Sequence, residues 1–140
     1  MFSLRRVRGK ERLSGMNSEA PTVFRLTAYH RFKASHTLEG FRIPHFHLWN
    51  VAVEFEHAYP LPGDRVVDLV IAEAKLGEIT GPLHDTLLDH SLGVSPTSEN
   101  LCVWIWDRMQ KSLPEARLSA VSVTLCDLEG HPGGRAELRR

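Results

Sequence analysis

The sequence contains no long apolar run and no excess of either charge. In its 140 residues, Lys and Arg together number 17, and so do Asp and Glu. Without surplus positive charge the chain lacks the means of a general nucleic-acid binder, so we expect no nucleic-acid partner. No apolar stretch approaches the roughly 18 residues that a membrane-spanning helix needs, so we expect no membrane partner either.

Cysteine is also scarce. Cys102 and Cys126 are the only two, and they form no C-x-x-C pair, so a disulfide scaffold is not expected, although a single structural disulfide stays open. The basic N-terminus is not followed by the apolar segment of a secretory signal, which predicts a cytoplasmic protein. Residues 1–20 lack hydrophobic periodicity and are expected to be a flexible basic leader, with residues 21–140 as a single domain.

Hydrophobic periodicity in the rest of the chain predicts an α+β fold. The expected strands are 23–36, 45–57, 118–126 and 135–138. Apolar residues at helical spacing predict a first helix over 68–79 and a second that begins after Thr97 as N-cap and stops at Pro114. The resulting order is ββααββ, in which the helices pack on one face of an antiparallel sheet.

Histidine is abundant, with eight residues, and three of these are expected to lie together. His45 and His47 stand at positions i and i+2 of a predicted strand, so both imidazoles leave the same face, about 6.6–7 Å apart. His36 ends the preceding strand, and a hairpin would bring it alongside. Three histidines without a fourth protein ligand are typical of a catalytic zinc site with one open position. The alternative is a pair of stacked surface histidines beside an unrelated third.

Asp89 and His90 form a second candidate group. A carboxylate beside an imidazole can orient the ring and stabilise its protonated form, which suits a general acid or base. The same dipeptide also occurs without any role in chemistry. The sequence contains no G-x-S-x-G, Walker A or H-E-x-x-H motif, so the hydrolase and nucleotide-binding folds that carry them are not supported.

Taken in order, four motifs resemble the 6-pyruvoyl-tetrahydropterin synthase and 6-carboxytetrahydropterin synthase family. They are Phe32-Lys33-Ala34-Ser35-His36, His45-Phe46-His47, Leu88-Asp89-His90 and Pro96-Thr97-Ser98-Glu99-Asn100-Leu101. The resemblance covers about residues 23 to 127, nearly all of the predicted domain. It implies a tunnelling fold, or T-fold, with a four-stranded sheet, and a homo-oligomer with its sites at subunit interfaces.

The resemblance also implies a chemistry. It places Zn²⁺ on His36, His45 and His47, and it assigns proton transfer to Asp89 and His90. The substrate would be a small-molecule pterin, usually 7,8-dihydroneopterin triphosphate, whose side-chain hydroxyls are polarised by zinc before triphosphate is eliminated. One branch of the family makes a pyruvoyl pterin, and another makes the carboxypterin precursor of queuosine.

Two positions depart from the family pattern. Where the family has its cysteine base this chain has no cysteine: Phe41 or a neighbour takes its place, an apolar ring cannot accept a proton, and Glu39 is the candidate replacement. Where the family has a glutamate that anchors the pterin, this chain has Leu125, with Asp127 and Glu129 as candidate substitutes. Without an acceptor at this point, buried pterin donors would stay unpaired at a cost of about 1–3 kcal/mol each.

Three functions therefore stay open. The first is a zinc-dependent lyase of the 6-pyruvoyl- or 6-carboxytetrahydropterin synthase type, with altered specificity or reduced activity. The second is a zinc-containing paralogue that binds a ligand without turnover. The third is a structural or partner-binding paralogue in which zinc holds the hairpin together.

Overall fold

Two hairpins, one at each end of the described chain, join to form a single sheet. The computed structural model describes residues 22–37 and 43–140. The strands are β1 (Val23–His36), β2 (His45–Ala58), β3 (Leu118–Cys126) and β4 (Pro132–Arg139). All neighbours pair antiparallel in the order β1-β2-β3-β4, so β2 and β3 meet at the centre of the sheet.

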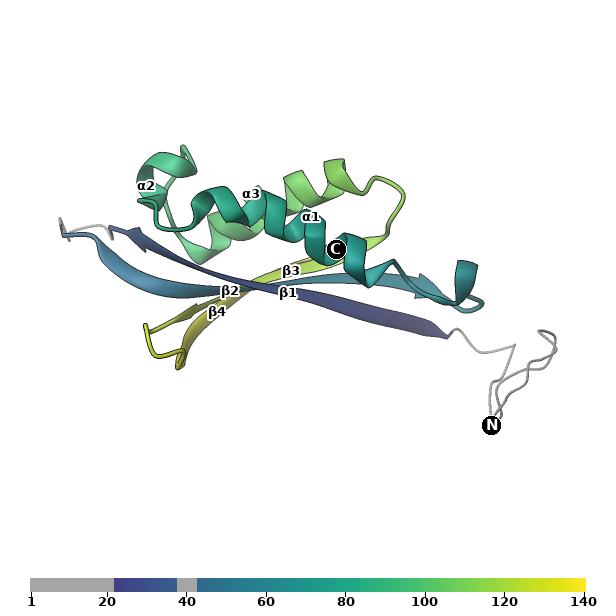
Figure 1. Ribbon diagram of the computed structural model, residues 1–140. Coiled ribbons are helices and arrows are strands. Elements are labelled where there is room, and N and C mark those ends of the chain that lie inside the picture. Colours follow the sequence, from purple (N-terminus) through teal and green to yellow (C-terminus); the bar gives the residue numbers. More distant parts are fainter. Residues whose placement is uncertain (1–21, 38–42) are drawn as a thin grey trace.

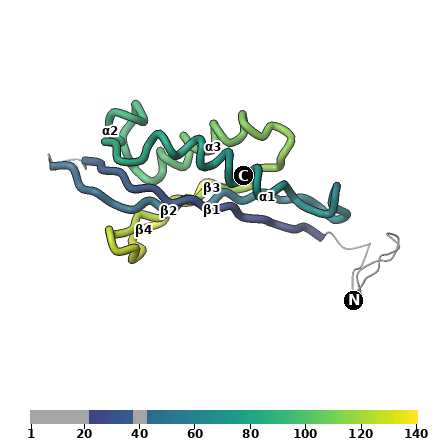
Figure 2. The backbone as a smooth tube through the Cα atoms, in the orientation of Figure 1, coloured from purple at the N-terminus to yellow at the C-terminus, as the bar shows by residue number. Residues whose placement is uncertain are grey.

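The helices lie between the two hairpins in the chain and cover one face of the sheet. They are α1 (Leu69–Thr80), α2 (Leu88–Ser91) and α3 (Ser98–Ser112), with short 3-10 turns η2 (Pro62–Asp64) and η3 (Gly81–Leu83). Figures 1 and 2 show the three helices on the same side of the sheet, while no described element covers the other side. The predicted ββααββ order is confirmed, with α2 as one additional helical turn.

Local signals explain where the two long helices begin. The Asp68 side chain caps α1 by accepting a hydrogen bond from the backbone N–H of Ile71. Thr97 caps α3 in the same way, through the backbone N–H of Asn100 at 3.1 Å. None of the described helices combines the length and apolar character needed to cross a bilayer.

The core lies between the helices and the alternate residues of β2. Its contributions from β2 are Trp49, Val51, Val53 and Phe55, each at most 1% exposed. They form one hydrophobic cluster with buried residues of α1 and α3, among them Leu76 and Ile105. The same face of β2 continues to His47 and His45, so the packing of this strand also determines where the histidines point.

Several predicted boundaries differ from the structure. The last strand begins at Pro132 rather than 135, because pairing with β3 draws Gly133 and Gly134 into the sheet despite their weak strand propensity. A Cβ at Gly133 would lie 3.0 Å from the carbonyl oxygen of Leu125, so glycine permits this close approach.

Two further expectations concern the cysteines and the N-terminus. Both cysteines are buried and free, so they form no disulfide. The predicted leader, residues 1–20, lies outside the described residues.

Candidate functional site

The three predicted metal ligands lie at one end of the β1–β2 hairpin. The strand register pairs His36 with His45, and Ala34 with His47. His36 is only 2% exposed, and its ring meets the ring of His47 edge-on, with 5.0 Å between the centroids. His47 is partly buried and His45 is exposed. The hairpin therefore places His36 beside the H-x-H pair.

Backbone carbonyls orient two of the three rings. Nδ1 of His36 donates to the carbonyl oxygen of Pro96 at 3.0 Å, and Nδ1 of His47 donates to that of Cys126 at 3.2 Å. A carbonyl can only accept, so each Nδ1 carries the proton and each Nε2 keeps its lone pair. Nε2 of His36 is buried and has no hydrogen-bond partner among the described residues. A buried acceptor left in this state costs about 1–3 kcal/mol, which a metal ion would remove.

The electrostatics of His47 also suit a metal ligand. Burial lowers the pKa of His47 below its ordinary value, and the neighbouring His36 and His45 lower it further, although the hydrogen bond to Cys126 acts in the opposite direction. Imidazole binds metal in its neutral form, and zinc is commonly held by three such rings. The donor set of the hairpin therefore fits Zn²⁺.

His45 is the exposed member of the set. Among the described residues, the potential ligand atoms of the three histidines are not all within 4.8 Å of one another. A tighter group is formed by Asp127, Glu129 and His131 in the β3–β4 turn, where all three side chains are exposed. The His45 side chain is exposed at the first residue of β2, on the strand face that also carries His47.

Asp89 and His90 lie on α2, beside the end of β1. Both oxygens of the Asp89 carboxylate accept hydrogen bonds from Thr37, one from its backbone N–H at 2.9 Å and the other from its hydroxyl. Burial alone would raise the pKa of Asp89, but these bonds outweigh it and hold that pKa below its ordinary value. The His90 side chain is exposed. Sequence analysis did not identify Thr37, because nothing in its local sequence marks it as a partner of Asp89.

The positions that depart from the family pattern fall into two groups. Glu39 and Phe41 lie outside the described residues. Leu125 pairs with Trp49 across β2 and β3, so its side chain shares the face of the sheet that carries His47, and it packs against the core. The Asp127 carboxylate accepts from two backbone N–H groups and from the His131 ring, so it stabilises the β3–β4 turn.

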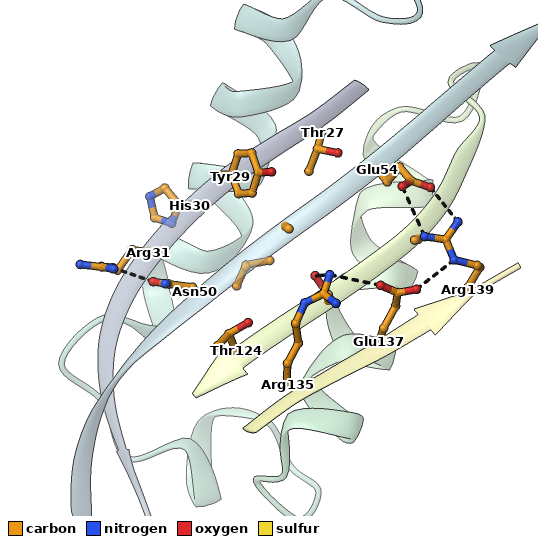
Figure 3. A pocket seen from close by; sticks show the side chains of 14 residues that line it. Thr27, Tyr29, His30, Arg31, Asn50, Glu54, Thr124, Arg135, Glu137 and Arg139 are labelled. Carbon is orange, nitrogen blue, oxygen red and sulfur yellow. Dashed lines mark hydrogen bonds and ion pairs between the residues drawn. The ribbon is translucent and has the colours of Figure 1, made fainter. Parts of the chain in front are cut away.

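The open face of the sheet carries a separate polar hollow of about 640 Å³. The Arg139 guanidinium forms ion pairs with both Glu54 and Glu137, at 2.9 Å in each case, and Figure 3 marks these contacts with dashed lines. Arg135 forms a further ion pair with Glu137 at 3.1 Å. Because Glu54 alternates with the buried residues of β2, this hollow lies on the opposite face from the histidine cluster, and its two glutamates are paired with Arg135 and Arg139.

A helix-covered antiparallel sheet with a histidine cluster at its hairpin end defines the class of protein: it has the architecture of the T-fold. The sequence profile of 6-pyruvoyl tetrahydropterin synthase matches residues 22–139, nearly the whole described chain, so the protein belongs to this family. The resemblance carried by the four motifs is thereby confirmed, and so is the predicted fold class.

Solved structures support the same fold. The 6-pyruvoyl tetrahydropterin synthase of Caenorhabditis elegans matches with a TM-score of 0.67 and 15% identity, over 84% of this chain and 96% of that one. The enzyme of the same name from Plasmodium vivax gives 0.65 and 15%, over 85% and 98%. An uncharacterised protein from Wolinella succinogenes gives 0.66 and 12%, over 84% and 98%. A sequence search of curated proteins gave no significant match.

Glu54 on the open face should make stability depend on pH. Burial alone would raise its pKa, but hydrogen bonds from Arg139 and Ser119 outweigh it and bring the pKa below its ordinary 4.5. The folded protein therefore gains stability from ionised Glu54 above about pH 4.5, and loses it as the pH falls through the lower, folded-state pKa. We expect metal-free wild type to lose more stability than Glu54→Gln between about pH 7 and about pH 3.5.

Urea unfolding midpoints at the two pH values measure this difference. Glu73→Gln, which changes an exposed glutamate of α1, is the matched control and should follow the wild type. Equal losses in wild type and Glu54→Gln would contradict the role given to the Glu54–Arg139 pair.

Proposed function

We propose that this protein is a zinc-dependent lyase that acts on a dihydropterin or a related heterocycle. The observation that carries the proposal is the buried Nε2 of His36, which has no hydrogen-bond partner among the described residues and lies beside His47. Hydrogen bonding of both Nδ1 atoms leaves two lone pairs for a metal, and His45 lies on the same strand face as His47, paired with His36 in the strand register. Membership of the 6-pyruvoyl tetrahydropterin synthase family supplies the reaction class.

The residues would divide the work as follows. Zinc on His36, His45 and His47 would polarise hydroxyl groups of the substrate side chain. His90, exposed on α2, is the candidate proton-transfer residue, and Asp89 lies next to it in the chain. Glu39, outside the described residues, is the candidate base in place of the family's cysteine. The substrate would be a small molecule, and the active protein a homo-oligomer with sites at subunit interfaces.

The leucine at position 125 supports the proposal that substrate specificity or reaction rate differs from that of the family pattern. Its partly buried side chain offers no hydrogen-bond acceptor on the face that carries His47. Asp127 is occupied in the β3–β4 turn, so it is poorly placed to replace the family's anchoring glutamate. This same observation favours the second candidate function, a zinc-containing paralogue that binds a ligand without turnover.

Zinc binding is the first test. We expect about one Zn²⁺ per chain, and we expect His47→Ala to weaken its retention sharply because one of three ligands is removed. His57→Ala, at the far end of the same strand, is the matched control and should keep the wild-type zinc content. Metal content after dialysis, measured by mass spectrometry, gives the answer. Full zinc content in a His36→Ala, His45→Ala, His47→Ala triple variant would overturn the assignment.

Turnover of the usual family substrate should be slow. Loss of a general base typically costs about 10²–10⁴-fold in rate, and loss of the pterin anchor should weaken binding by a further factor of about ten to a hundred. We therefore expect little conversion of 7,8-dihydroneopterin triphosphate, measured by mass spectrometry of the products. If Glu39 acts as the base, residual activity should disappear in Glu39→Gln and fall in His90→Ala while zinc stays bound. Native turnover near about 1 s⁻¹ would show that base and anchor are supplied by other residues.

Association is the third test. Edge strands with open hydrogen-bonding groups and a net charge of zero favour contact between copies. We expect light scattering at micromolar concentration to give a mass several times the 15.8 kDa of one chain. A mass equal to one chain would contradict the proposal that the sites lie at subunit interfaces.

A further inference from the structure

Three consecutive residues at the end of β1 are each hydrogen-bonded to one crossing segment, residues 86–96. The bonds join Ser35 to Thr86, His36 to Pro96 and Thr37 to Asp89. Their lengths are 2.9 Å for the backbone bond of Ser35, 3.0 Å for the ring of His36 and 2.9 Å for the backbone N–H of Thr37. The central residue of the three is the buried candidate metal ligand.

The crossing segment is itself held firmly in place. Leu88 is completely buried and Leu92 is 7% exposed, so both ends of the α2 turn are anchored in the core. Leu87 also forms a parallel β-bridge with Ser35. A residue that binds this segment is therefore attached to the core and not to a loose surface loop.

The Asp89 carboxylate accepts two hydrogen bonds from Thr37, one from the backbone N–H and one from the hydroxyl of Thr37. This double contact fixes the residue that directly follows His36, and so limits how the backbone of His36 can rotate. It also places a carboxylate close to a centre in which three neutral histidines would leave the full charge of Zn²⁺ uncompensated. Carboxylates and carbonyls behind the ligands of a metal orient those ligands and raise metal affinity.

We propose that Asp89 is a positioning residue for the metal centre and acts through Thr37. This inference rests on the proposed function, because it presumes a metal on His36. Thr37 becomes a functional residue in this account: its hydroxyl connects the α2 carboxylate to the strand end that carries the ligand.

Metal affinity tests the inference directly. We expect Thr37→Val and Asp89→Asn each to weaken Zn²⁺ binding by about 10-fold or more, measured by competition with a chromogenic chelator. Thr37→Ser keeps the hydroxyl and should restore affinity to near the wild-type value, which a loss of side-chain packing alone would not allow. His90→Ala is the matched control on α2 and should leave metal affinity unchanged. The absorption spectrum of bound Co²⁺ should change in Thr37→Val and Asp89→Asn, and stay the same in His90→Ala.

A double-mutant cycle then measures whether Asp89 and Thr37 act on the metal site through their shared contact. The Asp89→Asn and Thr37→Val effects on affinity should be far from additive, because both changes break the same contact. Unchanged Zn²⁺ affinity and Co²⁺ spectrum in both Thr37→Val and Asp89→Asn would overturn the inference while leaving the zinc site intact. A wild-type protein that binds no zinc would instead overturn the proposed function. If Thr37→Val does not fold, judged by its metal-free unfolding midpoint, Asp89→Asn decides: weaker binding supports the inference and wild-type binding overturns it.

Discussion

The candidate site depends above all on the hydrogen bond between the His36 ring and the carbonyl oxygen of Pro96. This bond fixes the tautomer of a buried imidazole, and it leaves the other ring nitrogen as an acceptor with no described protein partner. It also ties the end of β1 to the segment that carries Asp89 and His90. The histidine cluster and the Asp89–His90 pair are thereby brought into one region. A metal ion, which accepts a lone pair, would satisfy the unpaired ring nitrogen of His36.

The two faces of the sheet have different tasks. The helix-covered face is apolar, and its alternating pattern along β2 runs directly into the histidines, so core packing and ligand placement depend on the same strand. The open face is polar, and its ion pairs connect β2 with β4 across the small residues of β3. Because alternate residues of a strand point to opposite faces, one strand can serve both purposes without conflict.

Family membership accounts for the fold and is the basis of the proposed reaction class, but the departures from the family pattern are equally informative. Leu125 stands where the family resemblance implies an anchoring acceptor, and under the proposed function a pterin donor buried against it would stay unpaired. The turn carboxylate two residues later does not compensate, because backbone N–H groups and the His131 ring already occupy its oxygens. The three proposed metal ligands thus match the family pattern, while the position of the ligand anchor departs from it.

The sequence by itself determined the elements and the pair of histidines on one strand face. Period-2 alternation, the cap at Thr97 and the stop at Pro114 are local signals, and the i, i+2 spacing of His45 and His47 has one geometric meaning in a strand. The extent of β4 was underpredicted, because sheet pairing overrode the weak propensity of its glycines.

Only the tertiary structure decided which groups touch the site residues. The partner of His36 lies 60 residues away in the chain, and the partner of Asp89 lies 52 residues away. Such contacts follow from how the segment between α1 and α3 crosses the end of β1. No local pattern encodes that crossing, since it arises from the packing of Leu88 and Leu92 into a core shared by the whole chain.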